Sequence, residues 1–172
     1  MKPQKKRLII VLSLFVMAAS ISFTVLAQDN GSVLAGAELT RVVPTSYYFQ
    51  GQSAPTQMRN SAAARFGKNR FVIAGMVDTS GYSAEIRARY QGFFITDSAI
   101  TVGGESLATG AYGFGFSNDG KLNILDLAGN QVISVSTTND KDLKRPRPLM
   151  MTMDGANVRL YAGRDYVVIA AK

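Results

Sequence analysis

The feature of this sequence that most constrains its fold is a series of short apolar runs, separated by turn residues, after residue 70. The runs include Ala111–Phe116, Lys121–Leu127 and Gln131–Ser136, and Asp119-Gly120 stands between the first two. Asp-Gly between two apolar runs is a strong signal for a β-hairpin. Because no helix-length segment separates the runs, they predict an antiparallel sheet.

Further runs extend this pattern over most of the chain. Phe71–Val77 is continuously apolar, and Tyr82–Gln91 alternates between apolar and polar residues, as a strand with one buried face does. Later strands are expected at Leu149–Met153, Asn157–Ala162 and Tyr166–Ala170. We therefore predict an all-β domain, either a small antiparallel β-barrel or a β-sandwich.

One short helix is expected near the start of this domain, over Ser53–Phe66. Met58, Ala62 and Phe66 recur at a spacing of four residues, which would place them on one helix face. A serine at the start and a run of three alanines also favour a helix. The segment Glu38–Val43, before it, is expected to be a first strand.

The N-terminal segment 1–27 predicts an export signal with a helical apolar core. Basic residues within 2–7 precede an apolar run over residues 8–19. Val25 and Ala27 occupy the −3 and −1 positions of a signal cleavage site, which places cleavage between Ala27 and Gln28. The sequence therefore predicts a secreted or periplasmic protein.

An uncleaved membrane anchor is the alternative for this segment, because residues 8–27 are long enough to span a bilayer as a helix. In either case membrane contact is expected only through the N-terminal segment. Residues 28–36 are small and polar and are expected to form a flexible lead-in, and residues 37–172 form a single β-rich domain.

The composition excludes several kinds of catalytic and metal site. The chain contains no cysteine and no histidine, so it has no disulfide, no thiol nucleophile and no Ser-His-Asp triad. We therefore expect neither a cofactor nor a metal, and no enzyme activity.

Four of the nineteen Lys and Arg lie in the signal segment, which leaves fifteen against twelve acidic residues, a charge near +3. Nucleic acid is not an expected partner, because its binding needs a clustered basic face.

An aromatic strand is the candidate ligand site. Tyr112, Phe114 and Phe116 would share one strand face, and Gly113 and Gly115 would leave the other face nearly bare. Such an aromatic face is able to line an apolar cavity, and a bare face permits close approach by a ligand or another backbone. The alternative is tight core packing around aromatic anchors.

Two further clusters carry alternatives of their own. Tyr47-Tyr48-Phe49, with Arg59 and Arg65 near in sequence, would either close one end of the β-core or form a base-stacking patch. The basic cluster Lys144-Arg145-Pro146-Arg147 lies in the polar segment Thr137–Pro148, which is expected to be a surface loop. It would either be solvated or touch an anionic lipid or polysaccharide surface.

Taken together, the sequence predicts an exported, non-catalytic β-domain that binds a small apolar ligand or an envelope or extracellular partner. One alternative is a hydrolase that uses paired carboxylates, for which Glu85, Glu105, Asp97 and Asp126 are the candidates. The other is a purely structural envelope protein, tethered by an uncleaved N-terminal helix.

Overall fold

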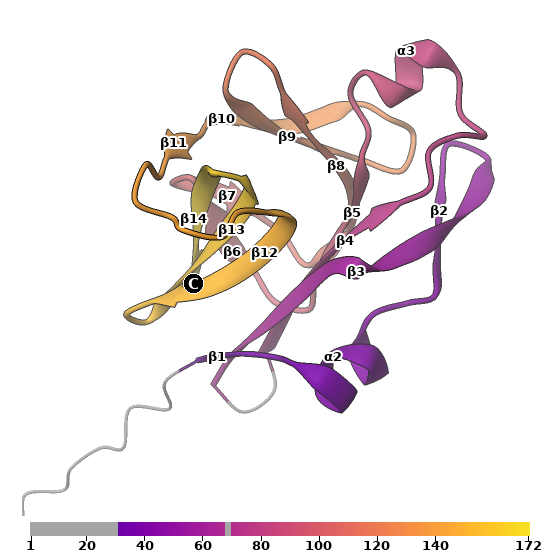
Figure 1. The fold of residues 1–172 in the computed structure, drawn as a ribbon. Coiled ribbons are helices and arrows are strands. Elements are labelled where there is room, and N and C mark those ends of the chain that lie inside the picture. The colour runs from indigo at the N-terminus through magenta and orange to yellow at the C-terminus, as the bar shows by residue number, and fades with distance from the viewer. Residues whose placement is uncertain (1–30, 68–69) are drawn as a thin grey trace, which may run out of the picture.

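The computed structural model describes residues 31–67 and 70–172, and strands dominate this part of the chain. The strands form two antiparallel sheets that pack against each other (Figure 1). The predicted signal segment 1–27, with the cleavage site between Ala27 and Gln28, lies outside the described residues. Among the helices in the described ranges, none is long and apolar enough to cross a membrane.

The first sheet contains most of the strands that precede residue 137. Its neighbouring strands follow the order β1, β3, β4, β5, β8, β9 and β10, and β2 also pairs with β3. Every ladder in this sheet is antiparallel. The strands are β1 (Ser32–Val33), β2 (Ser46–Phe49), β3 (Gln52–Phe66), β4 (Arg70–Val77), β5 (Gly92–Thr96), β8 (Gly110–Ser117), β9 (Lys121–Leu125) and β10 (Gln131–Ser136).

The second sheet joins the C-terminal strands to two short strands from the middle of the chain. Its order is β12, β13, β14, β6 and β7, and β11 also pairs with β14. All of these ladders are antiparallel as well. The strands are β6 (Ile100–Val102), β7 (Glu105–Leu107), β11 (Thr138–Asn139), β12 (Arg147–Asp154), β13 (Asn157–Gly163) and β14 (Asp165–Ala171).

The predicted antiparallel, mostly β architecture is confirmed, and it takes the open, sandwich-like form. The alternative prediction of a closed barrel is wrong, because no ladder in the described chain joins the two sheets. The hairpin turns fall where the sequence places them: Gly120 and Gly155 have φ of +74° and +61°, between β8 and β9 and between β12 and β13. Glycine adopts such angles without the steric cost that a Cβ brings.

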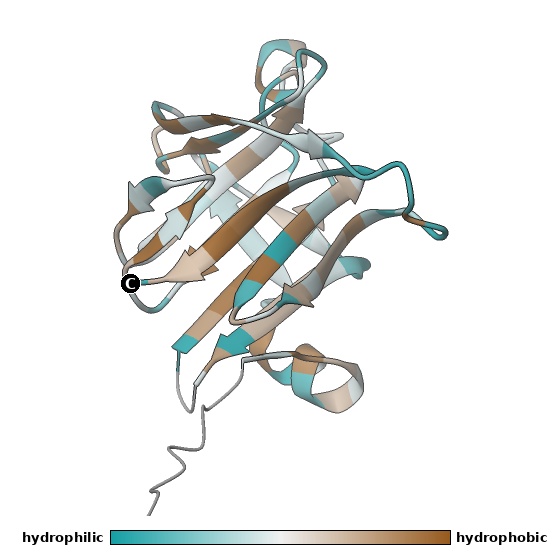
Figure 2. Ribbon diagram, turned by 90° about the vertical axis from the view of Figure 1, so that its left-hand side faces the viewer, coloured by the Kyte–Doolittle hydropathy of each residue, from teal (hydrophilic) through white to brown (hydrophobic). Residues whose placement is uncertain are grey.

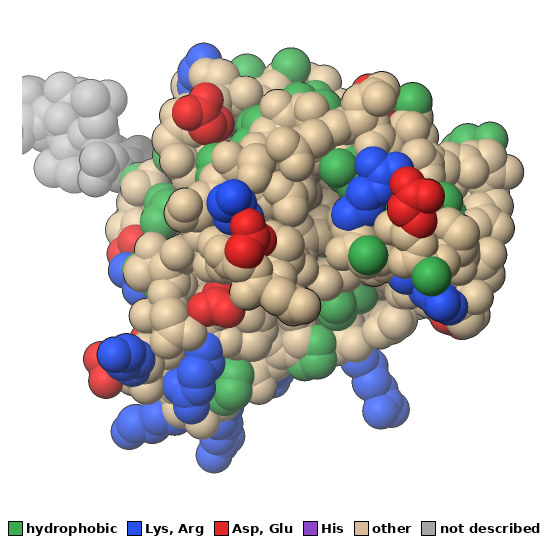
Figure 3. Space-filling view, turned by 90° about the horizontal axis from the view of Figure 1, so that it is seen from above, with side chains coloured by type: hydrophobic (Ala, Val, Ile, Leu, Met, Phe, Trp, Pro, Cys, Tyr) green, Lys and Arg blue, Asp and Glu red, His purple; other side chains and the backbone are tan. Residues whose placement is uncertain are grey.

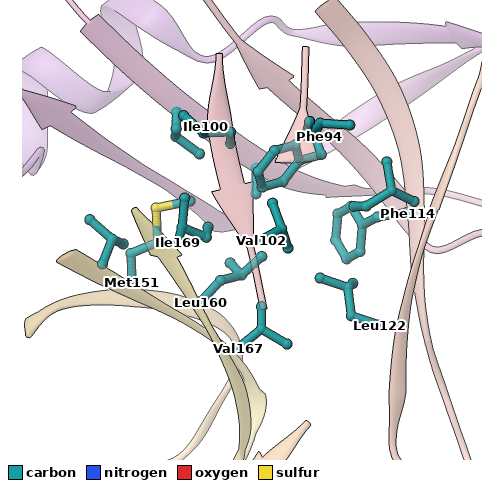
Figure 4. Close-up of a cluster of buried hydrophobic side chains, with 14 of the residues drawn as sticks. Phe94, Ile100, Val102, Phe114, Leu122, Met151, Leu160, Val167 and Ile169 are labelled. Carbon is teal, nitrogen blue, oxygen red and sulfur yellow. The ribbon is translucent and has the colours of Figure 1, made fainter. Parts of the chain in front are cut away.

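Large apolar side chains from both sheets fill the space between them. Phe94 of β5 and Phe114 of β8 point toward Val102 of β6 (Figure 4). Leu160 of β13 lies beside Val102, and Phe114 lies on the other side of Val102. All four side chains are fully buried. Burial of one such side chain stabilises the fold by about 1.5–3 kcal/mol, so this cluster holds the sheets together. Figure 2 shows hydrophobic and hydrophilic positions alternating along β13, whereas β14, which ends at the C-terminus, is mostly hydrophobic.

The predicted helix over Ser53–Phe66 is wrong, because this segment forms the long strand β3. Ala62, Ala63 and Ala64 are all buried, and they pair with β4 through consecutive residues. A strand that is covered on both faces and paired along its length gains more than the helical preference of alanine provides. The spacing of Met58, Ala62 and Phe66 also fits a strand, because a period of four contains a period of two.

The predicted strand over Tyr82–Gln91 is also wrong. Ser83 caps a one-turn helix there, α3 (Ala84–Arg87), by accepting a hydrogen bond from the backbone N–H of Ile86 at 3.3 Å. Tyr82 and Tyr90 are buried on either side of this turn, and Ile86 is half-buried between them. Their spacing of four residues is helical, and it competes with the alternation that predicted a strand.

The start of the described chain contains a helix where a strand was predicted. Glu38–Val43 is not a strand, because its residues lie mostly in α2 (Gly36–Val42), which Pro44 follows after one residue. Within the expected lead-in, residues 28–36, β1 pairs with β3 and the side chain of Leu34 is buried. This chain start packs near β12 as well as β3.

The glycine face of β8 allows other parts of the chain to come close. A Cβ at Gly113 would lie 2.6 Å from the ring of Phe49, and a Cβ at Gly115 would overlap the backbone carbonyl oxygen of Arg89. The close approach expected of a bare strand face is therefore made by the protein's own chain.

Gly115→Ala should lower the free energy of unfolding by about 1–3 kcal/mol, because the backbone at Arg89 has to move to accommodate the methyl group. Gly81→Ala is the matched control, since the nearest atom to its added Cβ would be Oε1 of Gln52, at 3.8 Å. Urea unfolding of both variants measures the difference. Equal losses of stability in the two variants would contradict the close contact between the backbone of Arg89 and Gly115 of β8.

Candidate functional site

A hollow beside the loop between β11 and β12 carries a concentration of basic side chains. The hollow has a volume of about 530 Å³, and we call it the basic hollow. Figure 3 shows Lys and Arg side chains gathered at the lower left of the molecule when it is viewed from above. The residues that line the basic hollow are Leu143, Lys144, Arg145, Arg147, Met150 and Met151.

Arg164, in the turn between β13 and β14, fixes the backbone of this loop. Its Nη1 atom donates to the carbonyl oxygen of Leu143 and lies within hydrogen-bonding distance of the carbonyls of Asp140 and Lys141, at 3.4 and 3.1 Å. The loop is therefore held at three backbone positions by one guanidinium group. This anchoring reduces the conformational entropy that the loop would lose on binding a ligand.

Two acidic residues, Asp140 and Asp142, lie in the same loop as the basic cluster. The Asp140 carboxylate accepts a hydrogen bond from the hydroxyl of Tyr161 at 3.0 Å and another from the backbone N–H of Asp142 at 3.1 Å. Lys144, Arg145 and Arg147 are all exposed, and none forms an ion pair within the described part of the chain. Their donor groups are therefore free to contact a ligand, next to the negative charges of Asp140 and Asp142 in the same loop.

A second, smaller hollow lies where the chain start passes between β3 and β12. It has a volume of about 290 Å³, and we call it the apolar hollow. Its walls include Leu34, Leu39 of α2, Ala62 of β3 and Leu149 of β12. Arg147, Met150 and Met151 line both this hollow and the basic hollow.

The apolar hollow is a consequence of how the sheets meet. β12 is the end strand of its sheet and comes close to β3 without a shared ladder. At one end of this seam the chain start fills the space, because a Cβ at Gly31 would lie 2.7 Å from the carbonyl of Arg65 and 3.1 Å from Cε of Met153. After Leu34 the chain turns away into α2, and the hollow occupies the seam beyond that point.

The aromatic residues predicted to bind a ligand lie on β8. Phe114 is fully buried between the sheets, and its ring meets the ring of Phe116 edge-on at 6.0 Å between centroids. The hydroxyl of Tyr112 donates to the carbonyl of Ala108 at 3.1 Å. None of these three aromatic residues lines the basic or the apolar hollow. Their role as ligand contacts stays a prediction.

The candidate catalytic carboxylates do not converge in the described structure. Asp97 accepts a hydrogen bond from the backbone N–H of Phe71 at 2.8 Å. Asp126 accepts two from Asn130 within its own turn, and these bonds lower the pKa of Asp126. Glu85 and Glu105 are exposed, on α3 and β7. Within the described ranges, no group of three or more acidic residues is placed to hold a metal ion.

A cluster of aromatic side chains covers the opposite face of the first sheet. Phe49 stacks on Tyr90 with ring centroids 3.9 Å apart, and Tyr47 stacks on Phe93 at 5.0 Å. Tyr82 also belongs to this cluster, and its hydroxyl lies 3.2 Å from the carbonyl of Phe49. The hydroxyls of Tyr47 and Tyr90 are buried and have no hydrogen-bond partner among the described residues.

The remaining members of the Tyr47–Phe49 proposal do not join this cluster. Tyr48 faces the solvent, with 58% of its surface exposed. Arg59 is exposed on β3, and Arg65 lies within 3.5 Å of the hydroxyl of Ser32 in β1. The two buried aromatic residues of the triplet therefore pack against the sheet, while the arginines lie elsewhere on β3.

Part of the basic hollow could be found from the sequence, and part could not. The cluster of Lys144, Arg145 and Arg147 is visible as a local run of charge. For Met150 and Met151 the sequence predicts only a strand, and for Arg164 only a turn. No local pattern signals that Arg164 holds the loop, because the contact spans more than twenty residues of sequence.

Tyr47→Phe should raise the free energy of unfolding at neutral pH by up to about 1 kcal/mol, because it removes a buried hydroxyl without a partner. Tyr82→Phe is the contrasting variant and should lower it by about 1 kcal/mol, because a hydrogen bond is lost. Urea unfolding measures both changes. The same sign for the two variants would contradict this assignment of the hydroxyls.

Tyr47→Phe should also change how the free energy of unfolding depends on pH. Burial raises the pKa of Tyr47 from 10.0 to about 12, so the folded state favours the neutral phenol. The unfolded chain ionises Tyr47 near pH 10, whereas the folded chain does so only near pH 12. The free energy of unfolding is therefore unaffected by this group below pH 10 and falls as the pH rises from 10 to about 12. Tyr47→Phe should therefore lose less stability than the unmodified chain over that interval, and equal losses would contradict the raised pKa.

Comparisons with known proteins do not assign this arrangement to a family. No model of a protein family matches the chain, and neither a curated protein nor a solved structure matches it.

Proposed function

We propose that this chain is an exported, non-catalytic binding domain that holds an anionic group of an envelope or extracellular partner in the basic hollow. The observation that carries the proposal is the set of three exposed cations, Lys144, Arg145 and Arg147, around one hollow and without ion pairs in the described chain. Cations that converge on a hollow attract an anion more strongly than the same charges spread over a surface.

The build of the loop supports this proposal. Arg164 holds the loop backbone at Asp140, Lys141 and Leu143, so a ligand would meet a loop that is already ordered. The volume of about 530 Å³ is within the range of sites that take small ligands. The proposal uses the basic hollow rather than Tyr112, Phe114 and Phe116, because Phe114 is occupied by packing between the sheets.

The proposed place of action comes from the N-terminal sequence. The basic segment 2–7, the apolar segment 8–19 and the cleavage motif that ends at Ala27 support export to the periplasm or the exterior. Retention of residues 8–27 as an anchor would keep the domain at the membrane surface on the same side. The proposal requires neither a metal nor a cofactor, and its partner is not a nucleic acid.

Lys144→Gln/Arg145→Gln should weaken binding of monobutyl phosphate about tenfold, because two exposed charge contacts of about 0.5–1 kcal/mol each are lost. Amide shifts in an NMR titration of the purified protein measure the affinity and locate the site. Arg87→Gln/Lys172→Gln is the matched control, since it removes the same charge from exposed positions outside the basic hollow.

Three results would contradict the proposal. The first is equal weakening by the control pair, which would indicate a general effect of net charge. The second is a set of shifted amides that excludes the loop over residues 141–147. The third is binding that does not weaken when the salt concentration rises, because exposed charges are screened by salt.

A further inference from the structure

The basic hollow and the apolar hollow lie next to each other on β12 and differ in the charge of the side chains that line them. Arg147, Met150 and Met151 line both, so the two hollows adjoin at β12. At the basic end Lys144 and Arg145 supply positive charge. At the apolar end the walls come from the chain start, α2, β3 and β12, and they are mainly apolar.

The apolar end offers few groups for a polar ligand. Leu34 and Leu149 are almost fully buried, and Leu39 of α2 is half-buried at its side. The hydroxyl of Ser61, which also lines this hollow, is 3.2 Å from the carbonyl of Gln57 and donates to it. A ligand that entered here would therefore replace water mainly against aliphatic carbon, which favours an alkyl group.

The two methionines suit the junction between these ends. Met150 is half-buried, and Met151, on the other face of the strand, is buried in the core between the sheets; both lie on the end strand β12. Methionine side chains are flexible and polarisable, so they adapt to alkyl groups of different shape. An alkyl chain that lies across them would keep its charged end at Lys144, Arg145 and Arg147.

We infer that the ligand of this surface is a free anionic amphiphile with a single short alkyl chain. Its phosphate or carboxylate head contacts Lys144, Arg145 and Arg147, and its chain crosses Met150 and Met151 into the apolar hollow under α2. This inference rests on the proposed function, which requires only the anionic head. The observation that carries it is that a cationic hollow and a mostly apolar hollow share Arg147, Met150 and Met151.

Calorimetric titration of the purified protein with monobutyl, monohexyl and monooctyl phosphate tests the inference. Affinity should rise about twofold to fourfold per added methylene, as expected for partial to full burial of each group. Octyl glucoside, which has the same chain and a neutral head, should bind at least about tenfold more weakly than monooctyl phosphate. Leu39→Asn should reduce the dependence on chain length, whereas Leu127→Asn, at an exposed position outside both hollows, should not.

The outcomes separate this inference from the proposed function. Equal affinity for the three alkyl phosphates would overturn the inference and leave anion binding intact. Equal affinity for octyl glucoside and monooctyl phosphate would overturn both, as would no binding of any of the four probes. Binding to phosphatidylglycerol vesicles in place of the soluble phosphates would overturn the assignment to a free ligand. Unfolding curves of Leu39→Asn confirm that it is folded before it is compared.

Discussion

The structure depends on the burial of large apolar side chains between two sheets, which share no ladder within the described part of the chain. Phe94 and Phe114 from the first sheet meet Val102 and Leu160 from the second, and this contact fixes how the sheets lie. Because β12 and β3 come together by packing and not by hydrogen bonds, the seam between them closes only where other side chains fill it. The apolar hollow is the part of this seam that the chain start leaves open after Leu34. The candidate ligand surface is therefore a product of the architecture itself.

Local signals were sufficient for the hairpins and insufficient for the segments around them. The strands β8, β9 and β10 follow one another with glycine turns between them, so each is determined by neighbours in sequence. Ser53–Phe66 and Tyr82–Gln91 each satisfy two periodicities, and distant partners decide between them. β3 becomes a strand because β4 and β1 pair with it, and the segment around α3 folds back because Tyr82 and Tyr90 pack on the outer face of the first sheet.

The candidate site shows the same division between local and distant information. The charge of Lys144, Arg145 and Arg147 is contiguous in sequence and could be recognised without a structure. These cations form no ion pair among the described residues, and the contact of Arg164 with their loop depends on the return of β13 and β14 beside it. The apolar end combines residues from the chain start, β3 and β12, which no sequence window contains together. An apolar ligand was expected at Tyr112, Phe114 and Phe116, whereas the apolar hollow lies at other residues and its position required the fold.

The most direct measurement of the central claim is a methyl NMR spectrum of the methionine-labelled protein with and without monooctyl phosphate. The account predicts that the methyl signals of Met150 and Met151 shift together, while a methionine elsewhere, such as Met58 on β3, keeps its position. Unchanged signals from Met150 and Met151 at saturating ligand would contradict it, because no alkyl chain could then lie across β12.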